Sequence, residues 1–197
     1  SSDLENTGTV MVKGIPVLTS DTLKFEEVMA NYKKVLTEIA RVYNEAMNII
    51  HYMHDKYYYE KAQMAFIDTN PRINLAYGVA GLSIALDSLS AIRYAKVTAR
   101  RNEIGLTEAF DIEGSFPCFG NNDDRVDQLG VDLVYFFSEE LKKLPVYKNA
   151  RPTLSLLTIT SNVMYGKKTG ATPDGRAKGV PFAPGANPMH GRDKNGA

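Results

Sequence analysis

The chain has 197 residues, of which 44% are hydrophobic and 23% charged, which is typical of a folded globular protein and excludes wholesale disorder. Lys and Arg number 23, and so do Asp and Glu, so the overall charge gives no case for a nucleic-acid or membrane-surface partner. The single cysteine excludes an internal disulfide framework, and no apolar run is long enough to span a membrane.

The first predicted element is a long amphipathic helix from about residue 23 to 53. No Gly or Pro interrupts this stretch, and apolar side chains recur in it at steps of three and four. Residues 20–22, Ser-Asp-Thr, offer an N-cap. The stripe continues into a second helical piece that is expected to reach Phe66, while residues 1–22 are expected to form an irregular lead-in.

A second helix is predicted over residues 74–95, after a turn that ends at Pro71. This segment is apolar on nearly all sides and carries almost no charge before Asp87. A helix of this kind is normally buried on most faces. We therefore expect it to be covered by protein that lies outside this chain.

The second half of the chain alternates strand and helix signals. Residues 110–113 alternate as a short strand. Residues 124–143 predict a helix, because acids occupy its first turn and lysines its last, as the helix dipole favours. Residues 153–160 are rich in β-branched side chains and alternate, which predicts another strand.

The tail, residues 166–197, contains seven Gly and four Pro. From residue 151 onward the chain carries seven basic and two acidic side chains, a net charge of +5, which leaves −5 for residues 1–150. A segment this long without secondary structure is unusual inside a compact domain. We expect it either to be disordered or to pack as an ordered loop on protein absent here, and both count against the chain being complete.

Two groups of side chains invite a metal-site interpretation, and neither supports it well. His51 and His54 stand three apart on a helix, but no third ligand follows at a diagnostic spacing. The second group is a cluster of four aspartates. It lacks the glycine and the terminal glutamate of a calcium loop, so helix capping explains it better. Its members are Asp123, Asp124, Asp127 and Asp132. We therefore predict no metal site.

The remaining candidates also favour structural roles. Cys118 is flanked by aromatic residues, with no His within fifty positions, which favours a packed thiol over a nucleophile. Residues 166–170, Gly-Lys-Lys-Thr-Gly, lack the spacing of a phosphate-binding loop. Thr-Pro-Asp-Gly-Arg at 172–176 is a turn by its chemistry, so Asp174, Gly175 and Arg176 are predicted to structure a loop, with Arg176 pinning it rather than holding an anion.

From the residues alone the prediction is an α+β protein, mainly helical, with one or two strands and no recognisable active site. Several runs of sequence indicate a family as well. Together they resemble pyruvate formate-lyase, and they occur in the same order as in that family from about residue 20 to 197. These runs are His51–Tyr57, Gly81–Ser83, Asp87–Val97, Phe119–Asp123 with Arg125–Asp127, Leu157–Val163, Tyr165–Arg176 and Pro184–Asp193. The turn at 172–176 is shared across glycyl radical enzymes.

The resemblance implies a cytoplasmic, anaerobic enzyme that cleaves pyruvate with coenzyme A to acetyl-CoA and formate, a formate C-acetyltransferase. In that family a radical stored on a backbone glycine passes to an adjacent cysteine pair, and the resulting thiyl attacks pyruvate. The implied fold is a ten-stranded α/β barrel wrapped by helices. The implied partners are the remainder of the same polypeptide, a second copy in a homodimer, and a radical S-adenosylmethionine activating enzyme.

The chain departs from the family in its chemistry. It has no adjacent cysteine pair, and the family's radical glycine lies downstream of the Gly-Arg-Asp run at 191–193, beyond Ala197. We therefore expect an interior segment, residues 23–197, with no catalytic residue, no covalently bound cofactor and no activity by itself. The resemblance therefore implies only a scaffold role for these residues. Leu157 or Ile159, on a barrel strand, is a candidate for the wall of the substrate cavity.

Two alternatives stay open at this point. One is a segment of another glycyl radical enzyme, of the diol dehydratase or choline lyase type, which shares the turn at 172–176. The other is a non-catalytic helical interaction module.

Overall fold

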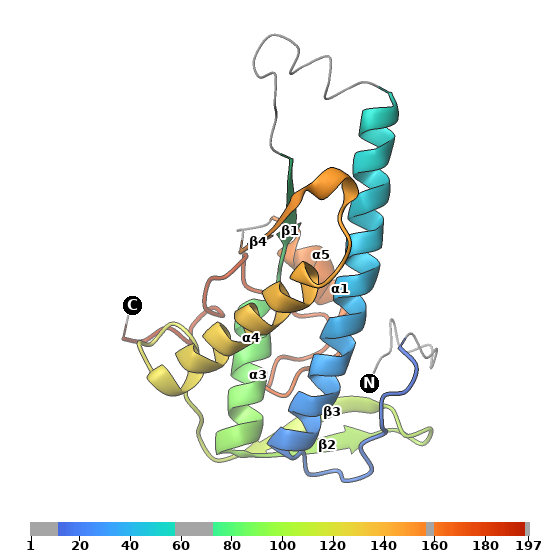
Figure 1. Ribbon diagram of the computed structural model, residues 1–197. Coiled ribbons are helices and arrows are strands. Elements are labelled where there is room, and N and C mark those ends of the chain that lie inside the picture. Colours follow the sequence, from blue (N-terminus) through green and yellow to red (C-terminus); the bar gives the residue numbers. More distant parts are fainter. Residues whose placement is uncertain (1–11, 58–72, 157–159, 196–197) are drawn as a thin grey trace.

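The computed structural model describes residues 12–57, 73–156 and 160–195 (Figure 1). Its elements in chain order are helix α1 (Phe25–Lys56), strand β1 (Asn74–Gly78), helix α3 (Leu82–Tyr94), strands β2 (Lys96–Arg101) and β3 (Thr107–Glu113), helix α4 (Asp124–Lys142), the 3-10 turn η1 (Tyr147–Asn149), strand β4 (Arg151–Ser155) and helix α5 (Asn162–Lys168). The described part is a mixed helix-and-sheet structure.

The long amphipathic helix is confirmed as α1, which has 32 residues and ends at Lys56. The predicted N-cap at residues 20–22 is wrong, because the N-cap position falls on Lys24, whose side chain makes no capping hydrogen bond. Residues 21–23 instead pair with β2: the Leu23 N–H donates to the Val97 carbonyl at 2.9 Å. The expected helical piece to Phe66 and the turn before Pro71 lie outside the described residues.

The predicted helix over residues 74–95 is partly wrong. Its first five residues form strand β1, and α3 begins only at Leu82. Gly81 separates the two with a φ of +78°, a backbone conformation that glycine adopts without strain. In β1 Leu75 and Tyr77 are buried, and the residues between and beside them are exposed. The exposed positions include Ala76 and Gly78, which are not polar, so the alternation of a strand does not show in the sequence.

Two separate pairs of strands flank the helices. β1 and β4 are parallel, with Leu75 opposite Pro152, although α3, the β2–β3 hairpin and α4 all lie between these two strands in the chain. β2 and β3 form an antiparallel hairpin (Figure 1). The strands predicted at 110–113 and 153–160 fall in β3 and β4, but β4 begins at Arg151 and ends at Ser155.

Helix α3 is buried inside this chain, contrary to the expectation that outside protein covers it. Ten of its thirteen residues are buried. Leu82, Leu86 and Leu89 pack with residues of α4, and the N-terminal half of α1 packs against the same cluster. The predicted helix at 124–143 is confirmed as α4, capped by Asp123, whose side chain accepts from the Arg125 N–H. A second cluster joins β1 to α1 and α4 around Tyr77.

Candidate functional site

The turn at Thr172–Arg176 stands beside the buried face of α3. The Gly175 N–H donates to the Thr172 carbonyl at 3.0 Å, and the Thr172 N–H donates to the Arg176 carbonyl at 3.0 Å. Gly175 has a φ of +91°, which an L side chain adopts only with strain. The residue types that predict a turn here therefore match its backbone.

Arg176 is 3% exposed, and its guanidinium is directed at the loop that contains it. Its Nη1 donates to the Val180 carbonyl at 2.7 Å and the Ala177 carbonyl at 3.1 Å, its Nη2 to the Gly170 carbonyl, and its Nε to Thr172 Oγ1 at 3.2 Å. Burial lowers the pKa of Arg176. Four of the five N–H donors of this side chain are thus engaged within the loop. No pair of free donors remains that would bind an anion through two hydrogen bonds.

Asp174 joins the turn to the rest of the protein. Its carboxylate is buried; Oδ1 accepts from Ser88 of α3 at 3.3 Å and from Thr172 Oγ1. Its Oδ2 accepts from Arg192 Nη1 at 2.7 Å, and its backbone carbonyl accepts from Arg192 Nη2 at 2.9 Å. Both carboxylate oxygens therefore have partners, as a buried charge requires.

Arg192 also holds Asp87, the acid in the middle of the apolar helix α3. Its Nη1 lies 2.6 Å from Asp87 Oδ2, and the Phe119 N–H donates to Asp87 Oδ1 at 2.8 Å. Burial raises the pKa of Asp87 more than the Phe119 N–H and Arg192 lower it. Burial also lowers the pKa of Arg192, but the hydrogen bonds and charges of the two aspartates outweigh it and the pKa is raised. We call Asp87, Asp174 and Arg192 the ionic cluster.

A polar clamp next to the ionic cluster holds the end of the described chain. Asn121 Nδ2 donates to the carbonyls of Cys118 and Arg192 at 3.0 and 2.9 Å. Asn121 Oδ1 accepts from the Lys194 and Asn195 N–H groups at 2.7 and 3.2 Å. The described tail is thus an ordered loop that packs on this chain's own α3 and the loop before α4, not on outside protein alone.

Cys118 lies beside the ionic cluster but is unsuited to nucleophilic attack. Burial raises the pKa of its thiol, and the charge of Asp87 raises it further. A thiol needs a lowered pKa to react as thiolate at neutral pH. The arrangement agrees with a packed thiol.

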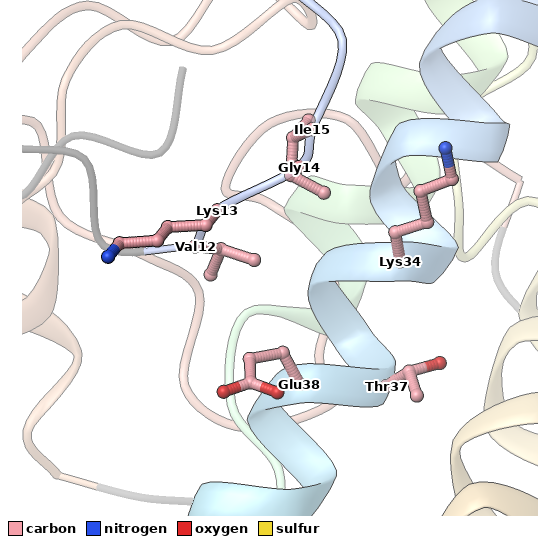
Figure 2. Close-up of a pocket in the computed structure, with 7 residues that line it drawn as sticks. All are labelled: Val12, Lys13, Gly14, Ile15, Lys34, Thr37 and Glu38. Carbon is pink, nitrogen blue, oxygen red and sulfur yellow. The ribbon is translucent and has the colours of Figure 1, made fainter.

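The described residues contain no group of three or more His, Cys, Asp or Glu side chains that would hold a metal ion. The rings of His51 and His54 lie 6.3 Å apart on α1. A surface cavity of about 500 Å³ lies between residues 12–15 and α1. Figure 2 shows its lysines, Lys13 and Lys34, pointing in different directions, so they do not converge on a ligand.

Sequence reasoning named Asp174, Gly175 and Arg176 but missed Asp87, Asn121 and Arg192, which complete the arrangement. A signal was present for Asp87, since a lone acid in an apolar helix needs a buried partner. Nothing in the pattern indicates that this partner is Arg192, which is 105 residues away. The two candidate cavity residues, Leu157 and Ile159, lie outside the described residues.

The contacts described above stabilise the fold, and among the described residues they bring no nucleophile next to a base. The class of protein is therefore identified by comparison with known proteins. The pyruvate formate lyase-like family profile matches residues 3–166. Over 180 residues the chain is 57% identical to Formate acetyltransferase 1 of Escherichia coli (strain K12), covering 91% of this chain and 24% of that protein. The chain belongs to the pyruvate formate-lyase-like family, and it spans about a quarter of the length of this curated relative.

Solved structures of glycyl radical enzymes share the fold. A Roseburia inulinivorans structure concerned with 1,2-propanediol dehydration matches with a TM-score of 0.67 and 22% identity, over 88% of this chain and 26% of that one. The glycerol-bound, B12-independent glycerol dehydratase of Clostridium butyricum gives 0.64 and 24%, over 88% and 25%. A glycyl radical enzyme of Archaeoglobus fulgidus gives 0.64 and 20%, over 89% and 26%. Within the described residues, no helix is long and apolar enough to cross a membrane.

Proposed function

We propose that this chain is a scaffold segment of an enzyme that cleaves pyruvate with coenzyme A to acetyl-CoA and formate by glycyl and thiyl radical chemistry. The observation that carries the proposal is the 57% identity over 180 residues to a formate acetyltransferase. The sequence has one cysteine and no adjacent pair. The reacting sulfur and the radical glycine therefore belong to polypeptide outside these residues, and the chain alone is inactive.

In this proposal the parallel strands β1 and β4 are part of the family's ten-stranded barrel. Leu157 and Ile159 follow β4 and supply part of the cavity wall. Asp174, Gly175 and Arg176 keep the loop after α5 in shape, and the ionic cluster fastens that loop to α3. The complete enzyme is cytoplasmic, forms a homodimer, uses coenzyme A as co-substrate and is activated by a radical S-adenosylmethionine enzyme.

The dehydratase alternative has weaker support. The dehydratase structures are at most 24% identical to this chain, a level that supports a shared fold and no shared substrate. A helical interaction module without chemistry has no supporting observation, since the chain belongs to an enzyme family over most of its length.

A segment graft tests the proposal. The aligned 180 residues replace their counterpart in the Escherichia coli relative, and the chimera is activated anaerobically by a radical S-adenosylmethionine activating enzyme. Acetyl-CoA formation from pyruvate and coenzyme A is expected from the chimera and not from the isolated chain. A chimera that carries a glycyl radical signal but turns over 1,2-propanediol instead of pyruvate contradicts the proposal, as does acetyl-CoA formed by the isolated chain.

A further inference from the structure

Helix α1 carries more apolar surface than the rest of the described chain covers. Its core-facing stripe consists of Leu36, Ala40, Tyr43 and Met47, which pack around Tyr77 of β1 and Phe137 of α4. A second apolar stripe runs about 110° further round the helix, at 3.6 residues per turn. It consists of Ile39, Val42, Ala46, Ile49 and Met53, which we call the α1 seam.

The α1 seam faces solvent. Ile49 is 63% exposed, Val42 51% and Ile39 43%, and Ala46 is exposed as well. Single exposed apolar residues are normal on a protein surface. The seam differs because its members occupy successive turns and form a continuous stripe roughly 21 Å long at 1.5 Å per residue. Continuous apolar stripes of this kind mark interaction sites.

The spacing within the seam indicates what kind of surface fits it. Its residues follow at steps of three, four, three and four. This average of 3.5 residues is the repeat with which one helix packs alongside another at a shallow crossing angle. A stripe of two residues in seven is as narrow as the seam between two packed helices, whereas a helix on a broad core has a wider apolar face. This width favours an α-helix that lies along α1.

The charged side chains at the edge of the seam indicate which helix packs against it. Arg41 pairs with Glu38 and with Glu45, both at 2.6 Å, along one edge. Two antiparallel copies of α1 joined through their seams bring the glutamates of both copies to the same edge, where like charges oppose association. A helix of different sequence avoids this repulsion. The curated relative is about four times longer than the aligned stretch, so most of its polypeptide lies outside that stretch.

We propose that the α1 seam is the docking face for another α-helix of the same enzyme polypeptide, contributed by residues outside this chain. Figure 1 shows α1 standing along one side of the body. The inference rests on the proposed function, because it takes this chain to be a segment of a longer glycyl radical enzyme.

Photo-cross-linking in the chimera tests the inference. Benzoylphenylalanine replaces Ile49 in the seam, or Ile104, which is 76% exposed but lies outside it, as the matched control. A mixture of ¹⁵N-labelled and unlabelled protein separates links within one polypeptide from links between copies. The seam position is expected to link to one peptide of the same polypeptide outside the graft, and the control position to give no such link.

A link from position 49 to α1 of a second copy overturns the inference, and so does a seam position that forms no cross-link to the same polypeptide. The readout needs a folded chimera but no turnover. A radical-bearing chimera that shows the expected link but leaves pyruvate intact therefore contradicts the proposed reaction, while the docking of α1 within one glycyl radical enzyme polypeptide stands. If the chimera does not fold, the same cross-linker at the position aligned with Ile49 in the Escherichia coli relative gives the same two outcomes.

Discussion

One nitrogen of Arg192, Nη1, lies 2.6 Å from a carboxylate oxygen of Asp87 and 2.7 Å from one of Asp174. Asp87 belongs to helix α3, and Asp174 to the turn after α5. A single guanidinium therefore joins two parts of the chain that share no backbone hydrogen bonding of their own among those described. Both carboxylates are fully buried, so neither has water as a substitute partner.

Arg192→Gln is expected to destabilise the chain strongly. The substitution leaves two buried carboxylates without their cation, a loss of about 3 kcal/mol in the free energy of unfolding. Arg100→Gln is the matched control, since Arg100 pairs with Asp111 at 3.2 Å on an exposed surface. It is expected to cost less than about 1 kcal/mol. Urea unfolding measures both, and equal losses contradict the assignment of the ionic cluster.

Arg176→Lys is expected to loosen the loop between Gly170 and Phe182. A lysine keeps the positive charge but cannot reproduce four hydrogen bonds in a planar fork, so the loss is about 1–3 kcal/mol. Limited proteolysis followed by mass spectrometry is expected to show new cleavage inside the loop. Lys178→Arg, on the exposed side of the same loop, is expected to leave the cleavage pattern unchanged. Identical patterns for both variants argue against a loop-structuring role for Arg176.

The thiol of Cys118 is expected to be alkylated only at a higher pH than an ordinary thiol. Burial and the charge of Asp87 raise its pKa, so the folded chain holds less thiolate at a given pH than an unfolded one. The alkylation rate with iodoacetamide is expected to reach half its maximum above the ordinary thiol value of about 8.5. Asp87→Asn removes the larger of the two aspartate charges that raise this pKa, the other being that of Asp174, and is expected to move the midpoint downward. A midpoint below that of the urea-unfolded chain refutes this account.

Gly120→Ala is expected to cost more than the left-handed backbone alone explains. Gly120 has a φ of +87°, and a Cβ built there collides with the ring of Pro188. Gly105, with a φ of +82° and nothing within 4 Å of a built Cβ, isolates the backbone cost. That cost is about 1–2 kcal/mol for Gly105→Ala. Thermal unfolding of both variants measures the excess, and a smaller loss at Gly120 contradicts the packing of the tail against this loop.

The helices with a clear polar face were predictable from the sequence, and the short strands β1 and β2 were not. The period of three and four identified α1, and the acids and lysines at the two ends of residues 124–143 identified α4, each to within a few residues. Residues 74–78 continue without a break into the apolar helix α3 and carry no charge, which predicts a helix, but they form strand β1 with Leu75 and Tyr77 buried and the other three residues exposed. β2 was missed although Val97 and Ala99 are buried at alternate positions, since half of the run is charged.

The candidate site was predictable only where its residues are adjacent in sequence. The turn chemistry of Pro, Asp and Gly at 173–175 is local, so these three residues are enough to predict the loop. The partners of Asp174 come from α3 and from the end of the described chain. Contacts of this kind depend on tertiary packing, which leaves no periodic trace in a single sequence.

The most direct test of the central claim is the rate at which the activated chimera converts pyruvate and coenzyme A into acetyl-CoA, measured beside the isolated 197-residue chain. The account predicts turnover by the chimera and none by the isolated chain, because the chain supplies scaffold and the reacting sulfur and glycine lie elsewhere. Acetyl-CoA formed by the isolated chain, or a folded, radical-bearing chimera that leaves pyruvate intact, contradicts it.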